Sequence, residues 1–254
     1  MTYCLGMLLD EGLVMMADTR TNAGVDNFSM YKKLHLLVDG PDRTIFACTA
    51  GNLSVTQTVM TLIQEGLAAE GPEGDLRRTL SDAGTMFRAA QLVGEAIQLA
   101  TRTVGKALAE LKISASSAIL LGGRIGNQRP ALFLMYDAGN FIQCKPEVPF
   151  FQIGETKYGR PILDREVRQK TPLADAVKCG FLSFDAAMAS NLGVARPIDI
   201  MVMPTDRSRP ILTKRIGQDD EYFNDVSRRW SDLLHDGARA IPNPPFMELG
   251  GDGG

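Results

Sequence analysis

The chain has 254 residues, of which 44% are hydrophobic and 22% are charged. This composition supports a sizeable hydrophobic core and excludes a largely disordered protein. The formal net charge of −3 gives no electrostatic reason to bind nucleic acid or an anionic membrane surface, so we expect neither as a partner.

The N-terminal region shows no export signal. Residues 1–9 contain no basic segment, and Asp10, Glu11 and Gly12 interrupt the apolar run. No segment approaches the ~20 consecutive apolar residues that a membrane-spanning helix needs. We therefore expect a cytoplasmic protein whose cysteines are reduced and mostly buried. The cysteines are Cys4, Cys48, Cys144 and Cys179.

The first fifty residues alternate between apolar runs and turns, which predicts β-strands. A hairpin is expected at the start, with Gly12 in its turn because glycine adopts positive φ at little cost. The predicted strands are Tyr3–Leu9, Leu13–Met16, Leu34–Val38 and Thr44–Thr49, with a loop over Thr21–Phe28.

The hydrophobic period then changes to that of helices. Asn52 is a candidate N-cap for a helix that runs to about Leu67. A loop over Glu70–Asp75 separates it from a longer amphipathic helix between about Ser81 and Leu111. The later predicted strands are Ser117–Leu121, Ala131–Tyr136, Phe141–Lys145, Phe150–Ile153, Ile198–Met203 and Ile211–Arg215, and the later predicted helices are Arg160–Arg168, Pro172–Asn191 and Asp219–Leu234.

This order of elements, runs of strands followed by helix pairs, is typical of an α+β fold with antiparallel sheets covered by helices. Two sheets packed face to face, with helices on both outer sides, satisfy it. No repeat or linker divides the chain, so we predict one domain over residues 1–241 and a Pro- and Gly-rich tail over 242–254. The glycine-rich segment Gly122–Gly126 is expected to form a hairpin loop rather than a phosphate-binding loop.

Thr2 lies directly after the initiator methionine. Removal of Met1 would expose a hydroxyl nucleophile and an α-amine on adjacent carbons, and such a pair acts as nucleophile and general base without a histidine. An α-amine has a reference pKa of about 7.7–8.0, so part of it is neutral near pH 7. Many chains begin with Met-Thr, and the interpretation therefore depends on the residues downstream of Thr2.

Several short segments appear in a fixed order after Thr2. They are Gly12, Ala17-Asp18-Thr19-Arg20, Lys32-Lys33-Leu34 and Thr49-Ala50-Gly51. This ordered set resembles the proteasome-type N-terminal nucleophile (Ntn) hydrolases. Further segments are more similar still to one bacterial branch of that group, Anbu, the ancestral β-subunit. These segments are Met1-Thr2-Tyr3-Cys4, residues 21–26 (TNAGVD), residues 54–57 (SVTQ) and residues 153–159 (IGETKYG).

The resemblance implies a four-layer αββα sandwich and a threonine-type peptidase that needs no cofactor. It also implies a self-compartmentalised homo-oligomer, a ring or ring-like stack, whose substrates are peptides or unfolded proteins. An ATPase or operon partner is left open. Two rival functions are also left open: an amidase of the same fold acting on a small amide or a cross-linked peptide, and a non-catalytic assembly scaffold that retains the fold.

The resemblance assigns four catalytic roles. Thr2 is the nucleophile, and Lys33 beside it favours deprotonation of the hydroxyl. Asp18 pairs with Lys33 and fixes it. The backbone N–H of Gly51, at a strand-to-helix junction, stabilises the oxyanion. Strand alternation alone does not decide between Lys32 and Lys33, and the resemblance selects Lys33.

The substrate is expected to lie along the segment after Asp18. By resemblance, the backbone at Thr21 and Asn22 holds an extended peptide, and several residues map near the pocket for the side chain before the scissile bond. These residues are Thr21, Tyr31, His35, Thr49 and Leu53. His35 is expected to be a pocket wall. With only two histidines, His35 and His235, the chain predicts neither a His-rich zinc site nor a Ser-His-Asp site, and we expect no metal.

Two distal segments depart from the ordinary proteasome pattern, which has Gly-Ser-Gly and Asp-x-x-Ser-Gly-Gly. Here they read Gly154-Glu155-Thr156 and Ser190-Asn191-Leu192-Gly193. Glu155 is a candidate acidic partner of Thr2 or a subunit contact. Asn191 can form hydrogen bonds without a charge, and we expect Asn191 and Gly193 to support the site only indirectly.

Overall fold

The computed structural model describes residues 2–22, 28–69 and 76–248. The chain divides into two compact units, Met1–Gln218 and Asp219–Gly254. The domain limits predicted from the sequence, a domain over residues 1–241 and a tail from 242, stay a prediction.

The first unit contains two antiparallel five-stranded sheets. One has the strand order β12 (Phe150–Gly154), β1 (Tyr3–Leu9), β2 (Gly12–Asp18), β13 (Ile198–Pro204) and β14 (Leu212–Ile216). The other has the order β11 (Phe141–Gln143), β10 (Ala131–Met135), β9 (Ser117–Ile125), β6 (Arg43–Gly51) and β5 (Leu34–Asp39).

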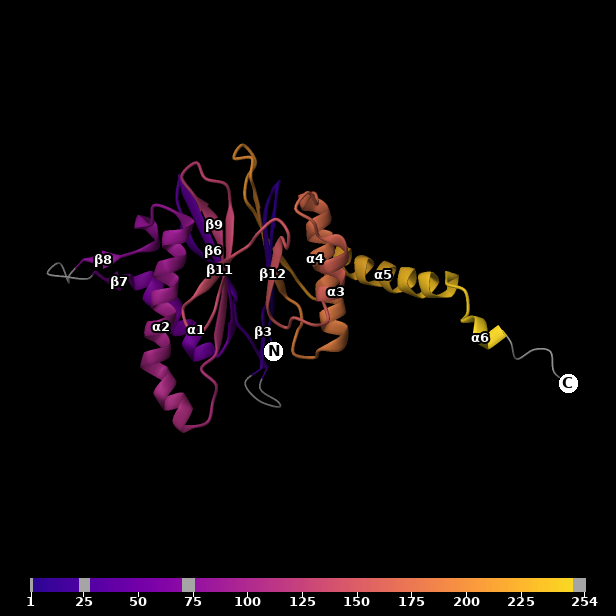
Figure 1. The fold of residues 1–254 in the computed structure, drawn as a ribbon, viewed down its shortest axis with the longest axis horizontal. Coiled ribbons are helices and arrows are strands. Elements are labelled where there is room, and N and C mark those ends of the chain that lie inside the picture. The colour runs from indigo at the N-terminus through magenta and orange to yellow at the C-terminus, as the bar shows by residue number, and fades with distance from the viewer. Residues whose placement is uncertain (1, 23–27, 70–75, 249–254) are drawn as a thin grey trace. The chain divides into compact units, whose positions relative to one another are not determined.

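Helices cover the outer face of each sheet. Figure 1 shows α1 (Leu53–Glu65) and α2 (Met86–Glu110) beside the β6–β9 sheet, and α3 (Arg160–Glu166) and α4 (Leu173–Ser190) beside the β1–β12 sheet. This arrangement confirms the predicted four-layer αββα sandwich. Two short hairpins complete the described part of the unit: β3 (Arg20–Asn22) with β4 (Phe28–Met30), and β7 (Leu67–Ala68) with β8 (Arg77–Arg78).

The first two helices begin directly after their capping residues. Asn52 caps α1, and its side chain accepts hydrogen bonds from the backbone N–H groups of Ser54 and Val55, as predicted. The second helix begins at Met86 rather than near Ser81, because Leu80–Asp82 forms a separate 3₁₀ turn and Thr85 supplies the N-cap. Sequence period alone does not distinguish such a turn from the first turn of a helix.

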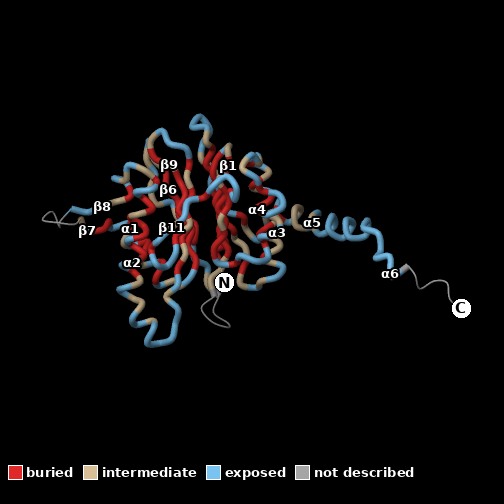
Figure 2. The backbone as a smooth tube through the Cα atoms, in the orientation of Figure 1, coloured by how far each residue is buried: buried red, intermediate tan, exposed pale blue. Residues whose placement is uncertain are grey.

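Buried hydrophobic residues of the described part of the chain gather between the layers. One cluster lies between the β6–β9 sheet and helices α1 and α2, and another lies between the two sheets. Figure 2 shows the buried positions concentrated on the strands and on the helix sides that face them. The segment Gly122–Gly126 does lie in a hairpin, between β9 and β10, but the connecting loop is shorter than predicted because β9 continues to Ile125. Gly122 faces the other sheet, where an added Cβ would lie 2.6 Å from the sulfur of Met15.

The second unit contains α5 (Glu221–Ala240) and the short helix α6 (Pro245–Glu248). Asp220 caps α5 by accepting a hydrogen bond from the N–H of Phe223 at 2.9 Å. The helix continues six residues beyond the predicted end at Leu234 and stops at Ala240, just before Ile241-Pro242, where proline disfavours helical geometry in the preceding residue. No helix in the described ranges is both long enough and apolar enough to cross a bilayer.

Candidate active site

Thr2 is held at the start of β1 by the neighbouring strand β12. Tyr3 lies opposite Gly154, and the N–H of Glu155 donates a hydrogen bond to the Thr2 carbonyl oxygen at 2.6 Å. Gly154 has a φ of +83°, and an added Cβ would lie 2.1 Å from the Thr2 carbonyl oxygen. Only glycine fits at position 154, so the close approach of Thr2 and Glu155 is built into the backbone.

Asp18, the last residue of β2, is fully buried and accepts three hydrogen bonds. Its Oδ1 accepts from the backbone N–H of Tyr3 at 2.9 Å and from Lys33 Nζ at 2.7 Å, and its Oδ2 accepts from the N–H of Arg20 at 3.2 Å. One carboxylate oxygen therefore joins the Lys33 ammonium to the peptide group directly after Thr2. The structure thus places Asp18 and Lys33 at the start of β1.

Lys33 is the buried member of the lysine pair. It is 4% exposed, and its Nζ donates a second hydrogen bond to the Arg20 carbonyl oxygen, whereas Lys32 is exposed. Burial raises the pKa of the Asp18 carboxyl, and the Lys33 ammonium together with the N–H groups of Tyr3 and Arg20 opposes that rise. The geometry therefore selects Lys33 as the residue that pairs with Asp18.

Gly51 ends β6 immediately before the N-cap of α1. Its φ is +107°, and an added Cβ would lie 2.3 Å from the carbonyl oxygen of Ser116, so the position requires glycine. Cys4, two residues after Thr2, donates its Sγ–H to the Thr49 carbonyl oxygen at 3.7 Å. The end of β6 therefore faces the start of β1 across the two sheets.

The residues predicted to bind substrate lie on segments that border this site. The loop predicted over Thr21–Phe28 was wrong at both of its ends, because Arg20–Asn22 pairs with Phe28–Met30, where Thr21 lies opposite Ser29. Residues 23–27 lie outside the described part of the chain. A local hairpin of three-residue strands has too little periodicity to be read from a sequence.

The other predicted pocket residues are distributed over three elements. Tyr31 lies beside Thr19, with its N–H bonded to the Thr19 carbonyl at 2.9 Å, and the N–H of Thr49 donates to the Lys33 carbonyl at 3.0 Å. Leu53 is the first residue of α1. His35 is half-buried on β5, where burial and then the charge of Lys32 lower its pKa.

Glu155 is 5% exposed in the single chain, so little of its surface is available for a subunit contact. Its Oε1 accepts hydrogen bonds from the N–H groups of Lys157 at 2.5 Å and Tyr158 at 3.2 Å. Its Oε2 is buried and has no hydrogen-bond partner among the described residues. The structure therefore places a buried carboxylate, with one oxygen unpaired, on the residue whose N–H bonds to Thr2.

The segment after α4 lies against Arg20. Asn191 is the C-cap of α4, and its Oδ1 accepts from the N–H of Gly193 at 3.0 Å. Arg20 Nη1 donates to the Leu192 carbonyl at 3.0 Å. Asn191 and Gly193 thus stabilise a turn that contacts Arg20, two residues beyond Asp18.

A buried polar network behind Thr2 was missed by the sequence analysis. The Tyr3 hydroxyl lies 2.5 Å from Ser183 Oγ and accepts from Gln152 Nε2 at 2.7 Å, and Ser183 Oγ donates to the Gly159 carbonyl at 2.9 Å. Burial raises the pKa of the Tyr3 phenol above its ordinary value, so the phenol stays neutral. The only sequence signals were a glutamine inside the apolar run Phe150–Ile153 and a serine within a predicted helix.

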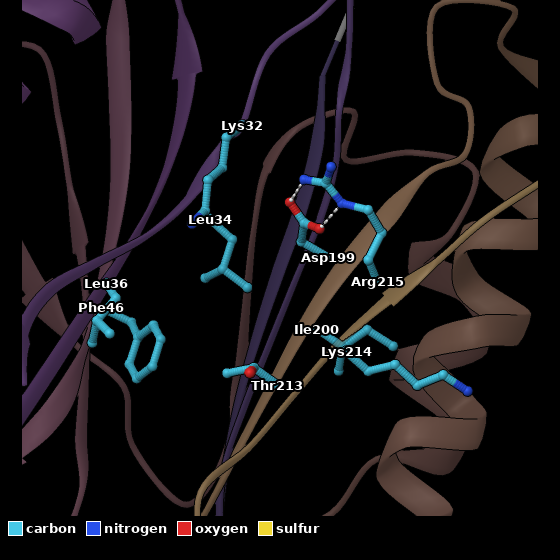
Figure 3. Close-up of a pocket in the computed structure, with 9 residues that line it drawn as sticks. All are labelled: Lys32, Leu34, Leu36, Phe46, Asp199, Ile200, Thr213, Lys214 and Arg215. Atoms are coloured by element: carbon cyan, nitrogen blue, oxygen red, sulfur yellow. Dashed lines mark hydrogen bonds and ion pairs between the residues drawn. The ribbon is translucent and has the colours of Figure 1, made fainter.

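A cavity of about 300 Å³ lies between the edge strands β5 and β14 and was also not predicted. Arg215 and Asp199 form a bidentate ion pair there, with distances of 2.6 and 2.8 Å. Figure 3 shows this pair facing Leu34 of β5 and Lys32, which lies two residues before that strand. The lining residues are Lys32, Leu34, Leu36, Phe46, Asp199, Ile200, Thr213, Lys214 and Arg215.

No protein-family model and no curated protein sequence matches the chain. Solved structures do match over nearly its whole length. Anbu from Hyphomicrobium sp. strain MC1 is 42% identical, with a TM-score of 0.85, and the match covers 96% of this chain and 100% of that one. Anbu from Yersinia bercovieri is 35% identical, with a TM-score of 0.83 and coverages of 96% and 99%.

A third match is the helical assembly of the Anbu complex from Pseudomonas aeruginosa. It is 38% identical, with a TM-score of 0.87, and the match covers 96% of this chain and 98% of that one. Identity at this level over nearly complete chains, together with the αββα sandwich, confirms the resemblance read from the ordered segments. The chain belongs to the Anbu family of ancestral β-subunits related to the proteasome.

Proposed function

We propose that this protein is an N-terminal threonine peptidase that becomes active when Met1 is removed. The observation that carries the proposal is the buried Lys33–Asp18 pair, which Asp18 anchors to the N–H of Tyr3 beside Thr2. A cation at this position favours the deprotonated hydroxyl of Thr2 and disfavours protonation of its α-amine. Both effects favour the threonine as a nucleophile.

The proposed reaction begins with attack of Thr2 Oγ on the scissile carbonyl carbon. The hydroxyl proton passes to the α-amine of Thr2, through a water molecule, and then to the leaving amine as the C–N bond breaks. The N–H of Gly51 stabilises the oxyanion, and Asp18 with Lys33 tunes the nucleophile. Water then hydrolyses the Thr2 ester. The scheme uses no metal and no organic cofactor.

The proposal includes a cytoplasmic homo-oligomer, a ring or ring-like stack. The helical assembly of the Pseudomonas aeruginosa relative supports it. Enclosure would restrict substrates to peptides or unfolded proteins that reach Thr2 along Thr21 and Asn22. The amidase alternative acts on small amides without needing enclosure, so parallel assays with peptides and small amides on intact and dissociated protein distinguish the two.

The test combines mass spectrometry with matched variants. We expect the native protein to begin at Thr2 and to carry the adduct of a threonine-directed electrophile on that residue. Thr2→Ala should abolish hydrolysis and the adduct while assembly persists, whereas Thr103→Ala, at an exposed position on α2, should change neither. Complete retention of Met1 on native protein, or equal activity in Thr2→Ala, contradicts the proposal and leaves the scaffold alternative.

A further inference from the structure

Glu155 is a buried carboxylate whose hydrogen-bonding capacity is only partly used. Its Oε1 is fixed by the N–H groups of Lys157 and Tyr158. Its Oε2 has no hydrogen-bond partner in the described ranges, although only 5% of the residue is exposed. An ionised carboxylate in such a position is costly unless a positive charge compensates it.

Glu155 lies next to Thr2. Its N–H bonds to the Thr2 carbonyl oxygen at 2.6 Å, one residue beyond the last strand pair, Tyr3 with Gly154. The Thr2 nitrogen is three bonds from that oxygen, so it lies within reach of a glutamate side chain that begins at Glu155. Removal of Met1 therefore creates an amine on Thr2, the residue whose carbonyl oxygen accepts the hydrogen bond of Glu155.

The charged and titratable groups packed around this position do not supply the missing charge. Tyr3 on β1 is neutral, and Asp18 on β2 is itself a carboxylate. The Lys33 ammonium binds Asp18 and the Arg20 carbonyl. Lys157 is exposed and contributes its backbone N–H. No cation of the described part of the chain forms an ion pair with Glu155.

We propose that Glu155 is the counter-charge for the α-ammonium of Thr2, a positioning residue that acts through the amine. The inference rests on the proposed function, since it concerns the same amine. With Met1 in place the nitrogen of residue 2 is a neutral amide, and cleavage of the Met1–Thr2 bond converts it to an ammonium facing the carboxylate. The ion pair orients the amine and favours its protonated form, which sets the pH at which the free amine acts as a base.

The experiment measures the titration of the amine itself. Ubiquitin fused before Thr2 and released by a deubiquitinase gives protein that begins at Thr2 whatever its natural processing. The pH dependence of N-terminal acetylation by acetic anhydride, read by mass spectrometry of the first peptide, gives the titration midpoint. We expect Glu155→Gln to lower that midpoint by roughly one pH unit. The exposed control Glu147→Gln should leave it unchanged.

The glutamine oxygen can still accept from Lys157 and Tyr158, so Glu155→Gln keeps the local turn. Glu155→Asp, which retains the charge on a shorter side chain, should give a midpoint above that of Glu155→Gln, and it serves as a second measurement should the glutamine variant fail to fold. Coincident midpoints for wild type and both variants would overturn the inference. Failure of the proposed function shows differently, as retained Met1 on native protein or as activity in Thr2→Ala, and neither alters this titration.

Discussion

Lys33→Met tests the energetic role of the buried ion pair. The substitution retains most of the alkyl chain but removes the ammonium that lies 2.7 Å from Asp18 Oδ1. Asp18, which is fully buried, would keep only the N–H groups of Tyr3 and Arg20. Removal of one partner from a buried pair typically costs about 3–5 kcal/mol. In a chain of this size that loss lowers the thermal midpoint at pH 7 by on the order of 10 °C.

The stability lost in Lys33→Met should be greater at higher pH. Burial already raises the pKa of Asp18 above its ordinary value, so the folded state holds this proton more tightly than the unfolded chain does. The contribution of Asp18 to the free energy of unfolding therefore falls as pH rises through the pKa that Asp18 has in the folded protein. The Lys33 ammonium limits that fall. Without Lys33 the pKa of Asp18 rises further. The difference between Lys33→Met and wild type should be large at pH 7 and should shrink as pH falls, because the lone Asp18 takes up a proton.

Thermal unfolding of matched variants at one protein concentration checks this reasoning. Lys32→Met removes an exposed lysine and should change stability by no more than about 0.5 kcal/mol. Adding Asp18→Asn to Lys33→Met removes the uncompensated charge and should recover at least half of the loss. If Lys33→Met were no worse than Lys32→Met, or if the second substitution recovered nothing, the buried-pair argument would be refuted.

Two further predictions concern positions that surround the site. Gly51→Ala forces a Cβ to within 2.3 Å of the Ser116 carbonyl oxygen at a φ of +107°. Chemical denaturation should therefore show that the free energy of unfolding falls by at least about 2 kcal/mol. A fall of less than about 0.5 kcal/mol would mean that the backbone at Gly51 is not constrained. Burial raises the pKa of the Cys144 thiol to about 12 and that of Cys48 well above its usual range, which suppresses the thiolate at pH 8. Native protein should therefore resist iodoacetamide at all four cysteines, whereas unfolded protein should react at each; rapid labelling of the native state would contradict the buried assignment.

The layers of the fold were readable from sequence because the helices bury one face and repeat with a helical period, whereas the inner strands, buried on both faces, are short apolar runs between turns. The errors fall where packing overrides composition. The glycines of Gly122–Gly126 suggest a loop, yet Gly122 lies inside β9, and the position is glycine because Met15 of the other sheet occupies the space that a side chain would need. A sequence does not show which strand will face which.

The candidate site was predictable to the same extent. Asp18 and Lys33 occupy fixed places in an ordered set of segments, and the structure brings them together beside Tyr3. The unpaired oxygen of Glu155 carries no sequence signal, since burial and partners are properties of the folded chain. The hydrogen bonds that join the Tyr3 hydroxyl to Gln152 and Ser183, about 150 and 180 positions away, arise only when β12 and α4 pack on β1.

The buried pair also bears on the choice between a hydrolase and a scaffold. Replacement of a buried ion pair by apolar residues of similar volume is often neutral or stabilises a protein by about 1–4 kcal/mol. A chain that only had to fold and assemble would therefore need an acceptor for the N–H groups of Tyr3 and Arg20 at position 18, but no ion pair beneath Thr2. The pair is explained instead by its electrostatic effect on Thr2, since the Lys33 ammonium favours the deprotonated hydroxyl. Lys33→Met with Asp18→Asn, which keeps an acceptor oxygen for the N–H groups of Tyr3 and Arg20, separates the two cases: both a scaffold and a hydrolase keep their assembly, and a hydrolase loses its activity.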